Sequence, residues 1–511
     1  MPADSLEVRR LALQAALDAV KTPAARNRLG QFATPPELAR QVVAAALDWL
    51  PAERPLRFLD PAFGTGSFLS ALLDLAPARR LERLAGHEID PHYGEPARRL
   101  WSDGGLELVL GDFTRAVPPA GAAATLIVCN PPYVRHHHLE PADKRRLQEL
   151  GERAAGVRLS GLAGLYAHFM LLAHAWAAEG AVAAWLVPAE FMDVNYGAAL
   201  RRYLAERVTL LRLHRFDAGE VQFGDALVTS AVLWWRHEPP PPGHRALFTT
   251  GGAIAAPRRA ESVAVERLRE AAKWSAGAFA AGTGAGIGAG RGETLGDLFE
   301  IKRGVATGDN RFFILGEAEI ARRGLPFECF TPILPGPRGL GPGVTVIEAD
   351  DDGLPRLEKR LFLLDCRLPE SELEDRHPAL WRYLQAGVPA VSQRYLCRHR
   401  TPWYAQDRRP PPPLLCTYMG RGAAPFRFLL NRSRATAPNV YLLLYHKPGP
   451  AAADPALIRR LWRGLNDMGA AGLIAAGRVY GGGLHKLEPR ELMGLPLAGM
   501  PVAADSESAP L

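Results

Sequence analysis

The residues best suited to chemistry in this 511-residue chain are Asn130, Pro131, Pro132 and Tyr133, which follow the apolar run 126–129. That run predicts a buried strand, and the prolines end it because proline cannot donate to a sheet ladder. The Asn130 side-chain oxygen and the Pro131 carbonyl could accept both protons of an amine conjugated to a ring. This would draw the nitrogen toward tetrahedral geometry and free its lone pair, while Tyr133 offers a stacking face. The tetrapeptide therefore predicts group transfer to a conjugated nitrogen.

Three carboxylates end three earlier predicted strands, which we expect at residues 56–60, 84–90 and 106–113. Because parallel strands end at one edge of a sheet, Asp60, Glu88 and Asp112 should lie together there. Glu88 can accept both hydroxyls of a ribose. Asp112 can accept from an adenine amino group, and Phe113 offers a stacking face. The three strand ends predict a nucleoside site.

The stretch "FLDPAFGTGSFL" at 58–69 predicts a strand, a glycine turn and a helix start. Gly64 and Gly66 would let the backbone pass close to a ligand. A dinucleotide fingerprint would need a third glycine, but Leu69 stands there. Asp60 would also repel a pyrophosphate, whereas S-adenosylmethionine carries an ammonium and a sulfonium and no phosphate. The turn therefore favours S-adenosylmethionine.

Alternating strands and helices must position these residues. This alternation predicts an α/β fold with a doubly wound, mostly parallel sheet between residues 55 and 235. We expect a catalytic domain at 1–245, a Pro- and Gly/Ala-rich linker at 246–292 and a second, α+β domain at 293–511. Further strands are expected at 124–130, 181–188, 210–216 and 226–237, and helices at 67–75, 166–178 and 196–208.

The order of "GQFATPPELA", "DPAFGTGSFL", "HEID", "GDF" and "NPPY" resembles the gamma-class, TaqI-like family of type II DNA adenine-N6 methyltransferases. The resemblance covers nearly the whole chain and is densest over 30–135. It implies a class I S-adenosylmethionine-dependent fold, transfer to N6 of an adenine flipped out of duplex DNA, and a C-terminal target-recognition domain. Phe63 stands where the family commonly has cysteine, and His87 where it has an aliphatic residue.

The same resemblance assigns roles to individual residues. Cofactor binding is implied for Thr34, Pro35, Asp60, Gly64, Gly66, Glu88, Asp112 and Phe113. Catalysis is implied for Asn130, Pro131 and Tyr133, and stacking on the target base for Tyr133 and Phe223. A separately encoded restriction endonuclease is implied as a possible partner in the cell.

The region after residue 293 is rich in arginine and aromatic residues, which suit phosphate and base-edge contacts. The candidates for DNA contact are Lys302, Arg303, Arg311 and Arg421. Any one of them could equally be a solvated surface charge. The recognition sequence cannot be derived from these residues.

Composition sets broader limits. The net charge of +7 and pI near 9.2 are compatible with a polyanionic partner, but weakly so for this length. Five scattered cysteines indicate a reducing compartment, and neither a signal peptide nor a membrane span is predicted, so we expect a protein of the bacterial cytoplasm. We also expect a monomer. No metal is expected at His136, His137 and His138, because adjacent histidines rarely reach one ion.

Three alternatives stay open. A cytosine-N4 methyltransferase would use similar chemistry but more often carries serine at the position of Asn130. A protein glutamine methyltransferase could use the same tetrapeptide, although it would not need so large a second domain. A DNA-binding module with a relict cofactor fold is disfavoured by the intact Asp60, Glu88, Asp112 and Asn130.

Overall fold

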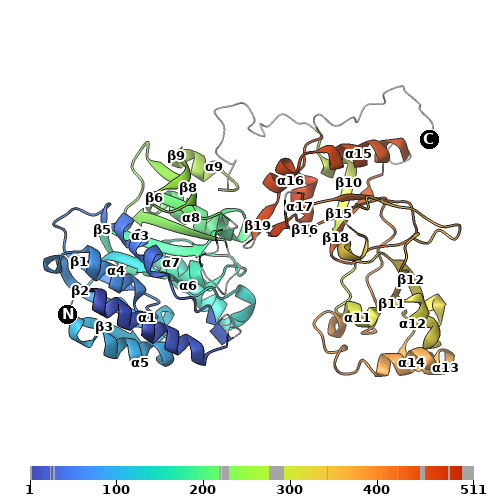
Figure 1. Cartoon of the computed structure of the whole chain (residues 1–511), viewed down its shortest axis with the longest axis horizontal. Coiled ribbons are helices and arrows are strands. Elements are labelled where there is room, and N and C mark those ends of the chain that lie inside the picture. Colours follow the sequence, from blue (N-terminus) through green and yellow to red (C-terminus); the bar gives the residue numbers. More distant parts are fainter. Residues whose placement is uncertain are drawn as a thin grey trace. The chain divides into compact units, whose positions relative to one another are not determined.

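The computed structural model describes residues 3–22, 25–26, 29–217, 220, 222, 229–274, 293–341, 343–422, 424–448, 455–480 and 484–497. The chain divides into two compact units near residue 286, with a short return to the first unit after residue 479. Figure 1 shows the N-terminal unit in blue to green and the C-terminal unit in yellow to red. Each unit has its own core and is described by itself.

A nine-stranded sheet forms the centre of the N-terminal unit, in the order β3-β2-β1-β4-β5-β7-β6-β8-β9. Strands β3, β2, β1, β4 and β5 are parallel, β7 runs antiparallel to β5 and β6, and β9 runs antiparallel to β8. The strands are β1 (Leu56–Asp60), β2 (Leu81–Glu88), β3 (Leu106–Leu110), β4 (Ala124–Cys129), β5 (Ala177–Pro188), β6 (Thr209–Arg215), β7 (Ser230–Arg236), β8 (Arg245–Gly252) and β9 (Pro257–Ala264).

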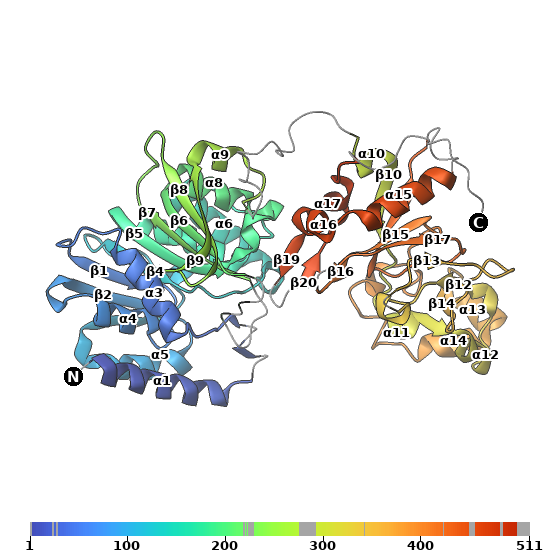
Figure 2. The same ribbon diagram turned by 45° about the horizontal axis from the view of Figure 1, so that its top comes forward.

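Helices cover both faces of this sheet (Figure 2). Alternate residues of β4 show why: Leu126 and Val128 pack into the core on one face, and Ile127 and Cys129 into the core on the other. One face carries α3 (Pro36–Leu47), α4 (Ser67–Leu75) and α5 (Pro91–Leu100), with α1 (Ala3–Val20) packed on α4 and α5. The other carries α6 (Pro141–Ala155), α7 (Leu165–Ala173), α8 (Ala198–Glu206) and α9 (Val265–Glu270).

These observations confirm the predicted α/β class and its mostly parallel sheet with helices on both faces. Two boundaries were wrong. The linker does not begin at 246, because β8, β9 and α9 extend the sheet and its core through that region. The helix expected at 166–178 ends sooner, because Ala177 already pairs with Ala124 as the first residue of β5. Residues 275–292 of the expected linker lie outside the described residues.

The C-terminal unit is α+β, as expected, and its described residues form three small sheets. The largest has the order β10-β18-β15-β17-β13, and the others have the orders β11-β14-β12 and β16-β20-β19. The strands are β10 (Phe299–Arg303), β11 (Ile314–Gly316), β12 (Phe330–Ile333), β13 (Val346–Ile347), β14 (Leu361–Leu364), β15 (Leu414–Thr417), β16 (Met419–Gly420), β17 (Phe428–Asn431), β18 (Tyr441–His446), β19 (Arg478–Tyr480) and β20 (Leu484–Lys486).

Two groups of helices pack on these sheets. The five-stranded sheet shares a core with α10 (Leu295–Leu298), α15 (Pro455–Asp467), α16 (Ala470–Ala476) and α17 (Pro489–Met493). The sheet β11-β14-β12 shares another with α11 (Asn310–Phe313), α12 (Glu317–Arg322), α13 (Glu370–Arg376) and α14 (Pro378–Gln385). None of the helices in the described ranges is long and apolar enough to cross a membrane.

Candidate active site

The carboxyl ends of β1, β2, β3 and β4 bring the predicted residues to one edge of the sheet. Asp60 and Glu88 are the last residues of β1 and β2, Asp112 follows β3, and Asn130 follows β4. The strands are neighbours and parallel, so the prediction that these side chains lie at one edge is met by the topology. A cavity of about 250 Å³ opens at this edge.

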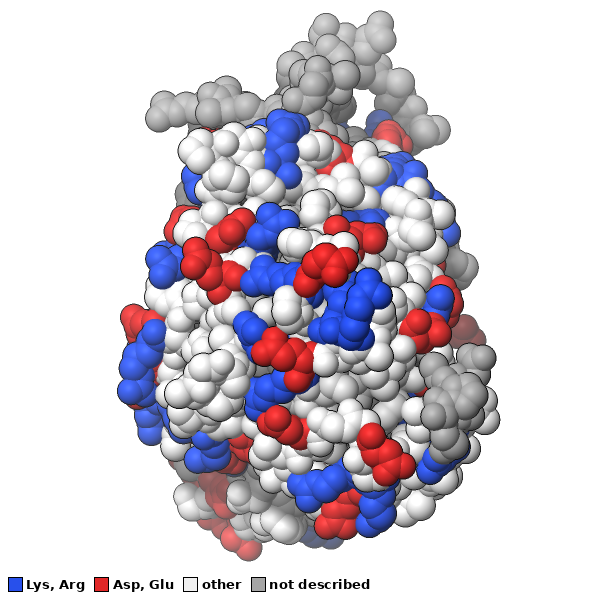
Figure 3. Space-filling model, turned by 90° about the vertical axis from the view of Figure 1, so that its left-hand side faces the viewer, with Lys and Arg blue, Asp and Glu red and all other residues white. Residues whose placement is uncertain are grey.

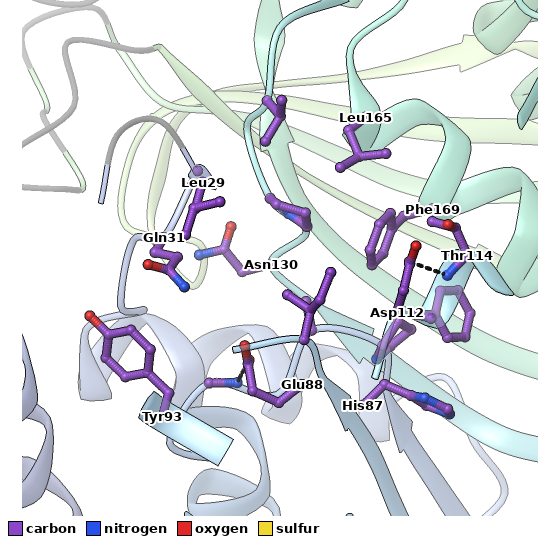
Figure 4. Close-up of a pocket in the computed structure, with 18 of the residues that line it drawn as sticks. Leu29, Gln31, His87, Glu88, Tyr93, Asp112, Thr114, Asn130, Leu165 and Phe169 are labelled. Atoms are coloured by element: carbon purple, nitrogen blue, oxygen red, sulfur yellow. Dashed lines mark hydrogen bonds between the residues drawn. The ribbon is translucent and has the colours of Figure 1, made fainter. Parts of the chain in front are cut away.

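Five of the predicted residues line that cavity: Gly64, Glu88, Asp112, Phe113 and Asn130. Thr34, Pro35, Asp60, Gly66, Pro131 and Tyr133 lie close by in sequence to lining residues but are not part of its wall. Figure 4 shows the arrangement, with Asn130 beside Leu29 and Gln31, and with Asp112, Thr114 and Phe169 on another side of the cavity.

The glycine turn between β1 and α4 uses its two glycines differently. Gly64 has a φ of +57°, borders the cavity and donates its N–H to Glu88 Oε2 at 2.8 Å. Gly66, with a φ of +90°, leaves no space for a side chain, because a Cβ there would lie 2.7 Å from the rings of Phe63 and Trp101. Gly64 therefore shapes the wall, and Gly66 allows the turn to close onto the core.

Phe63, one of the two departures from the family pattern, is accommodated by glycines. It is buried, and a Cβ on Gly86 would lie 2.6 Å from its ring, as one on Gly66 would also collide with it. The larger side chain fills the space that these two glycines leave open. The other departure, His87, lies against Phe113 and Trp176, with ring centroids 5.4 and 5.3 Å away.

Glu88 is held firmly at the floor of the cavity. Besides the bond from Gly64, its Oε1 accepts the backbone N–H of Asp90 at 2.9 Å. Burial raises the pKa of Glu88, while the two backbone N–H donors oppose that rise. Each carboxylate oxygen retains a second lone pair, so Glu88 can still accept hydroxyl groups from a ligand.

Asp60 lies beneath the glycine turn. It is 1% exposed, and its Oδ1 accepts the backbone N–H of Ala62 at 3.0 Å. Burial raises its pKa to about 7, and the nearby Glu88 carboxylate adds to the rise, against the hydrogen bond from Ala62. Asp60 fixes the turn through its hydrogen bond from Ala62.

Asp112 and Phe113 form another wall. Asp112 Oδ1 accepts the Thr114 backbone N–H at 2.8 Å, and its Oδ2 lies 3.4 Å from Arg115 Nε. Phe113 is 2% exposed and packs on Phe169 of α7, with ring centroids 5.4 Å apart.

Several residues that line the cavity were not predicted from the sequence. Ile89 is a large apolar side chain that is 64% exposed and borders the cavity directly after Glu88. Its place in "HEID", immediately after the acidic strand end, was the available signal. Phe169 comes from α7 and carried no local signal. Gln14, Asp18, Leu29 and Gln31 show that the N-terminal segment also contributes to the wall.

This set of groups fits S-adenosylmethionine. Glu88 and Asp112 supply acceptors for hydroxyl and amino groups, and Ile89 and Phe113 supply apolar contacts. The buried Asp60 and Glu88 carboxylates, both with raised pKa values, would gain from a nearby positive charge. A phosphate at this edge would instead face two buried carboxylates.

Asn130 has a defined amide orientation. Its Nδ2 donates to the Phe32 carbonyl at 2.9 Å and to Thr34 Oγ1 at 3.2 Å. A carbonyl can only accept, so the amide nitrogen must face Phe32 and the oxygen must face away. Within the described residues, no group donates to Asn130 Oδ1 or to the Pro131 carbonyl. Two acceptors are therefore available at the end of β4.

Tyr133 is held in place by a hydrogen bond from its hydroxyl and by a ring contact with Phe32. Its hydroxyl donates to the Leu186 carbonyl at 3.2 Å, and its ring lies 5.8 Å from that of Phe32, tilted by 44°. Burial raises the pKa of its phenol, so the hydroxyl is protonated. The predicted partner aromatic, Phe223, lies outside the described residues.

The three histidines after this loop form the short helix His136–His138, and none is buried. No group of three or more potential metal ligands occurs within the described ranges.

The predicted DNA contacts of the C-terminal unit are not equivalent. Lys302 pairs with Glu300 at 2.8 Å, and Arg303 pairs with Glu488 and lies over the Tyr418 ring at 5.5 Å. Arg311 and Arg421 are exposed. Lys302 and Arg303 thus share their charge with carboxylates of the same unit.

Two family models match the chain. The model described as "Eco57I restriction-modification methylase" matches residues 125–223, and the model "Type II methyltransferase M.Eco57I, C-terminal domain" matches residues 288–510. The matches include the tetrapeptide after β4 and nearly all of the C-terminal unit.

Similar whole proteins are methyltransferases. The chain is 30% identical to type II methyltransferase M.XamI of Xanthomonas campestris pv. amaranthicola over 473 residues, which cover 91% of this chain and 84% of that protein. It is 23% identical to type II methyltransferase M.AccI of Acinetobacter calcoaceticus, over 91% and 85% of the two chains. The solved type IIL restriction-modification enzyme MmeI shares the fold with a TM-score of 0.53 and 13% identity, over 88% of this chain and 66% of MmeI.

The similarity to M.XamI extends over both units at a level that assigns the family. S-adenosylmethionine is the cofactor, in agreement with the groups at the strand-end cavity. The chain belongs to the type II DNA methyltransferases of restriction-modification systems.

Proposed function

We propose that this methyltransferase is site-specific and methylates N6 of an adenine flipped out of duplex DNA. The observation that carries the proposal is the pair of available acceptors at the end of β4, Asn130 Oδ1 and the Pro131 carbonyl, beside the cofactor cavity. An exocyclic amine has two protons, and two acceptors match them.

The two acceptors would activate the amine directly. Its lone pair is delocalised into the ring, which makes it a weak nucleophile. Hydrogen bonds from its protons to Asn130 Oδ1 and the Pro131 carbonyl favour a tetrahedral nitrogen whose lone pair is localised. Pro131 and Pro132 restrict the backbone, so the acceptors need little reorganisation. S-adenosylmethionine, when bound, supplies the electrophilic methyl group.

The base must leave the helix to reach these groups. Tyr133 would stack on the flipped adenine, and its anchoring to Leu186 keeps the ring in place. Unstacking and unpairing a base costs on the order of a few kcal/mol, which stacking on an aromatic ring partly offsets. No side chain is needed to form a covalent bond to the substrate, so the methyl group would pass in one step. The amine proton would then leave to solvent.

For the cofactor we assign Glu88 to the ribose hydroxyls and Asp112 to the adenine amino group. Ile89 and Phe113 would contact the adenine, since both border the cavity and each directly follows one of these carboxylates in sequence. Asp60, Gly64 and Gly66 would form the turn near the methionine part.

Duplex DNA would be contacted by the C-terminal unit, and the turn 394–400 is the surface that supports this best. Tyr395 is 69% exposed, with the Arg398 guanidinium 5.4 Å and the His399 ring 4.7 Å from its ring. The base of the turn is rigid, because Arg400 donates to the carbonyls of Thr307 at 3.0 Å and Ala306 at 2.6 Å. An exposed aromatic ring among basic side chains suits phosphate and base contacts.

The charge of the N-terminal unit supports a separate recognition surface. On the face drawn in Figure 3, basic side chains alternate with acidic ones, and no broad basic area is visible among the described residues there. This face of the N-terminal unit therefore offers no broad surface for a polyanion, and we assign that affinity to the arginines of the C-terminal unit.

The test is expression of the chain in a methylation-deficient bacterial host, followed by mapping of modified bases in its genome. We expect N6-methyladenine at one short recurrent sequence, and none with Asn130→Ala. N4-methylcytosine at a recurrent sequence would contradict the proposal and support a cytosine-N4 methyltransferase instead. Unmodified DNA with methylated protein glutamine would replace it by a protein methyltransferase.

A further inference from the structure

The segment Gly30–Thr34 lies against the tetrapeptide loop rather than only beside the cofactor. Gly30 has a φ of +65°, and a Cβ there would lie 2.3 Å from the Tyr133 backbone nitrogen. The Phe32 ring contacts the Tyr133 ring. The two segments are about a hundred residues apart in sequence and are packed as closely as backbone atoms permit.

Both N–H groups of the Asn130 amide are used by this segment. One goes to the Phe32 carbonyl at 2.9 Å and one to Thr34 Oγ1 at 3.2 Å. Thr34 is 6% exposed and is absent from the cavity wall. Its hydroxyl accepts from Asn130, whereas the family resemblance implies a contact of Thr34 with the cofactor.

The segment is also fixed to the ribose end of the cofactor site. Gln31 Nε2 donates to Asp90 Oδ2 at 2.7 Å, and Lys21 bonds to the same carboxylate and to Gln31 Oε1. The Asp90 backbone N–H in turn donates to Glu88 Oε1. A continuous set of hydrogen bonds thus runs from Glu88 through Asp90 to the residue preceding Phe32.

We propose that Gly30–Thr34 is a positioning segment, in which Thr34 and the Phe32 carbonyl hold the Asn130 amide with its oxygen toward the substrate nitrogen. This inference rests on the proposed role of Asn130 and adds residues that act through its amide. Without Thr34 Oγ1 the amide keeps one anchor and can rotate, so the acceptor is no longer preorganised. Thr34 is a positioning residue.

The test uses three variants of the full chain: Thr34→Val, Thr34→Ser and Thr125→Val. Valine keeps the shape of Thr34 and removes its acceptor, whereas serine keeps the acceptor. Thr125 is the matched control. It is buried on β4 at the opposite end from Asn130, where its hydroxyl bonds to the Pro55 carbonyl and the Arg57 backbone N–H.

The readouts are the single-turnover methylation rate of unmethylated DNA at saturating cofactor, and the cofactor Kd from calorimetry. Loss of one hydrogen bond to the amide predicts a rate about tenfold lower for Thr34→Val with an unchanged cofactor Kd. Thr34→Ser should restore most of the rate. Thr125→Val should keep the wild-type rate even if it melts at a lower temperature.

A rise in cofactor Kd for Thr34→Val, with the rate restored at higher cofactor concentration, would overturn the positioning role in favour of direct cofactor contact. An unchanged rate would overturn it as well. The wild-type product separates this outcome from failure of the proposed function: N6-methyladenine from the wild type shows that the function stands whatever Thr34 does. Methylcytosine would refute the adenine assignment. The ratio of the methylation rates of the Thr34→Val and Thr34→Ser variants would still decide the positioning role.

Discussion

The two units place their functional groups in contrasting ways. In the N-terminal unit, Glu88, Asp112 and Asn130 each lie at or directly after the carboxyl end of a strand of one sheet, so the sheet fixes their positions. In the C-terminal unit the cations stand on short elements and turns, and several are used up by internal ion pairs, such as Arg303 with Glu488. The comparison teaches that residue type alone predicts a role only where the backbone fixes the site.

The largest effect is expected at the end of β4. Asn130→Ala removes an acceptor preorganised for the transition state and should lower the methylation rate about 10²- to 10³-fold, as loss of such groups does elsewhere. The cofactor Kd should stay within a small factor of the wild-type value. Rate and affinity are measured by single-turnover methylation and calorimetry. A variant that loses cofactor affinity and rate in parallel would show that Asn130 acts through the cofactor site.

A change at the end of β2 should act on affinity instead. Glu88→Gln keeps the size of the side chain but weakens a charge-assisted acceptor, so the cofactor Kd should rise about tenfold. The rate at saturating cofactor should change much less. Glu82→Gln, at the exposed amino end of the same strand, is the control and should leave the Kd unchanged. Equal changes in cofactor Kd for the two substitutions would contradict the assignment of Glu88 to the ribose hydroxyls.

In the C-terminal unit, Arg398→Gln should weaken DNA binding about three- to tenfold and reduce the dependence of log Kd on log salt by about one unit, as expected for one lost phosphate contact. Cofactor affinity should not change. Arg322→Gln on α12, with a side chain that is 75% exposed, is the matched control. Identical dependences of log Kd on log salt for the wild type and Arg398→Gln would show that the turn 394–400 does not contact DNA phosphates.

The smallest effect concerns Asp60 and pH. Its folded-state pKa, about 7, lies above the ordinary value of 3.8, so the folded protein retains a proton that the unfolded chain releases. The resulting stabilisation is complete below pH 4 and is lost as the pH rises to about 7. Asp60→Asn should therefore lower the pH dependence of the melting temperature of the cofactor-free protein across this range, by a shift of about a few degrees. Matching pH profiles for the variant and wild type would contradict the buried, protonated Asp60.

The sequence predicted the N-terminal unit well because its signals are local. Apolar runs followed by Asp60, Glu88 or Asn130 define both a strand and the group that it presents. The contacts of Thr34 and Phe169 are not local: Thr34 meets Asn130 across 96 positions, and Phe169 reaches Phe113 from a helix on the other side of β4 in sequence. The true extent of the sheet was missed because β8 and β9 follow a proline-rich stretch that resembles a linker.

The C-terminal unit shows the opposite limit. Lys302 and Arg311 look alike in sequence, yet Lys302 pairs with Glu300 on its own strand and Arg311 is exposed at the start of α11. Which cation is free depends on partners brought in by the fold, and Glu488 reaches Arg303 from 185 residues away. Composition therefore predicted the class of partner but not the residues that would contact it.

The most direct test of the central claim is the identity of the methylated nucleoside. Purified protein is incubated with methyl-labelled S-adenosylmethionine and DNA from a methylation-deficient host, and the digested nucleosides are separated by mass spectrometry. The account predicts label in N6-methyladenine with the wild type and its loss with Asn130→Ala. Label in N4-methylcytosine, or an Asn130→Ala protein that forms N6-methyladenine at the wild-type rate, would contradict it.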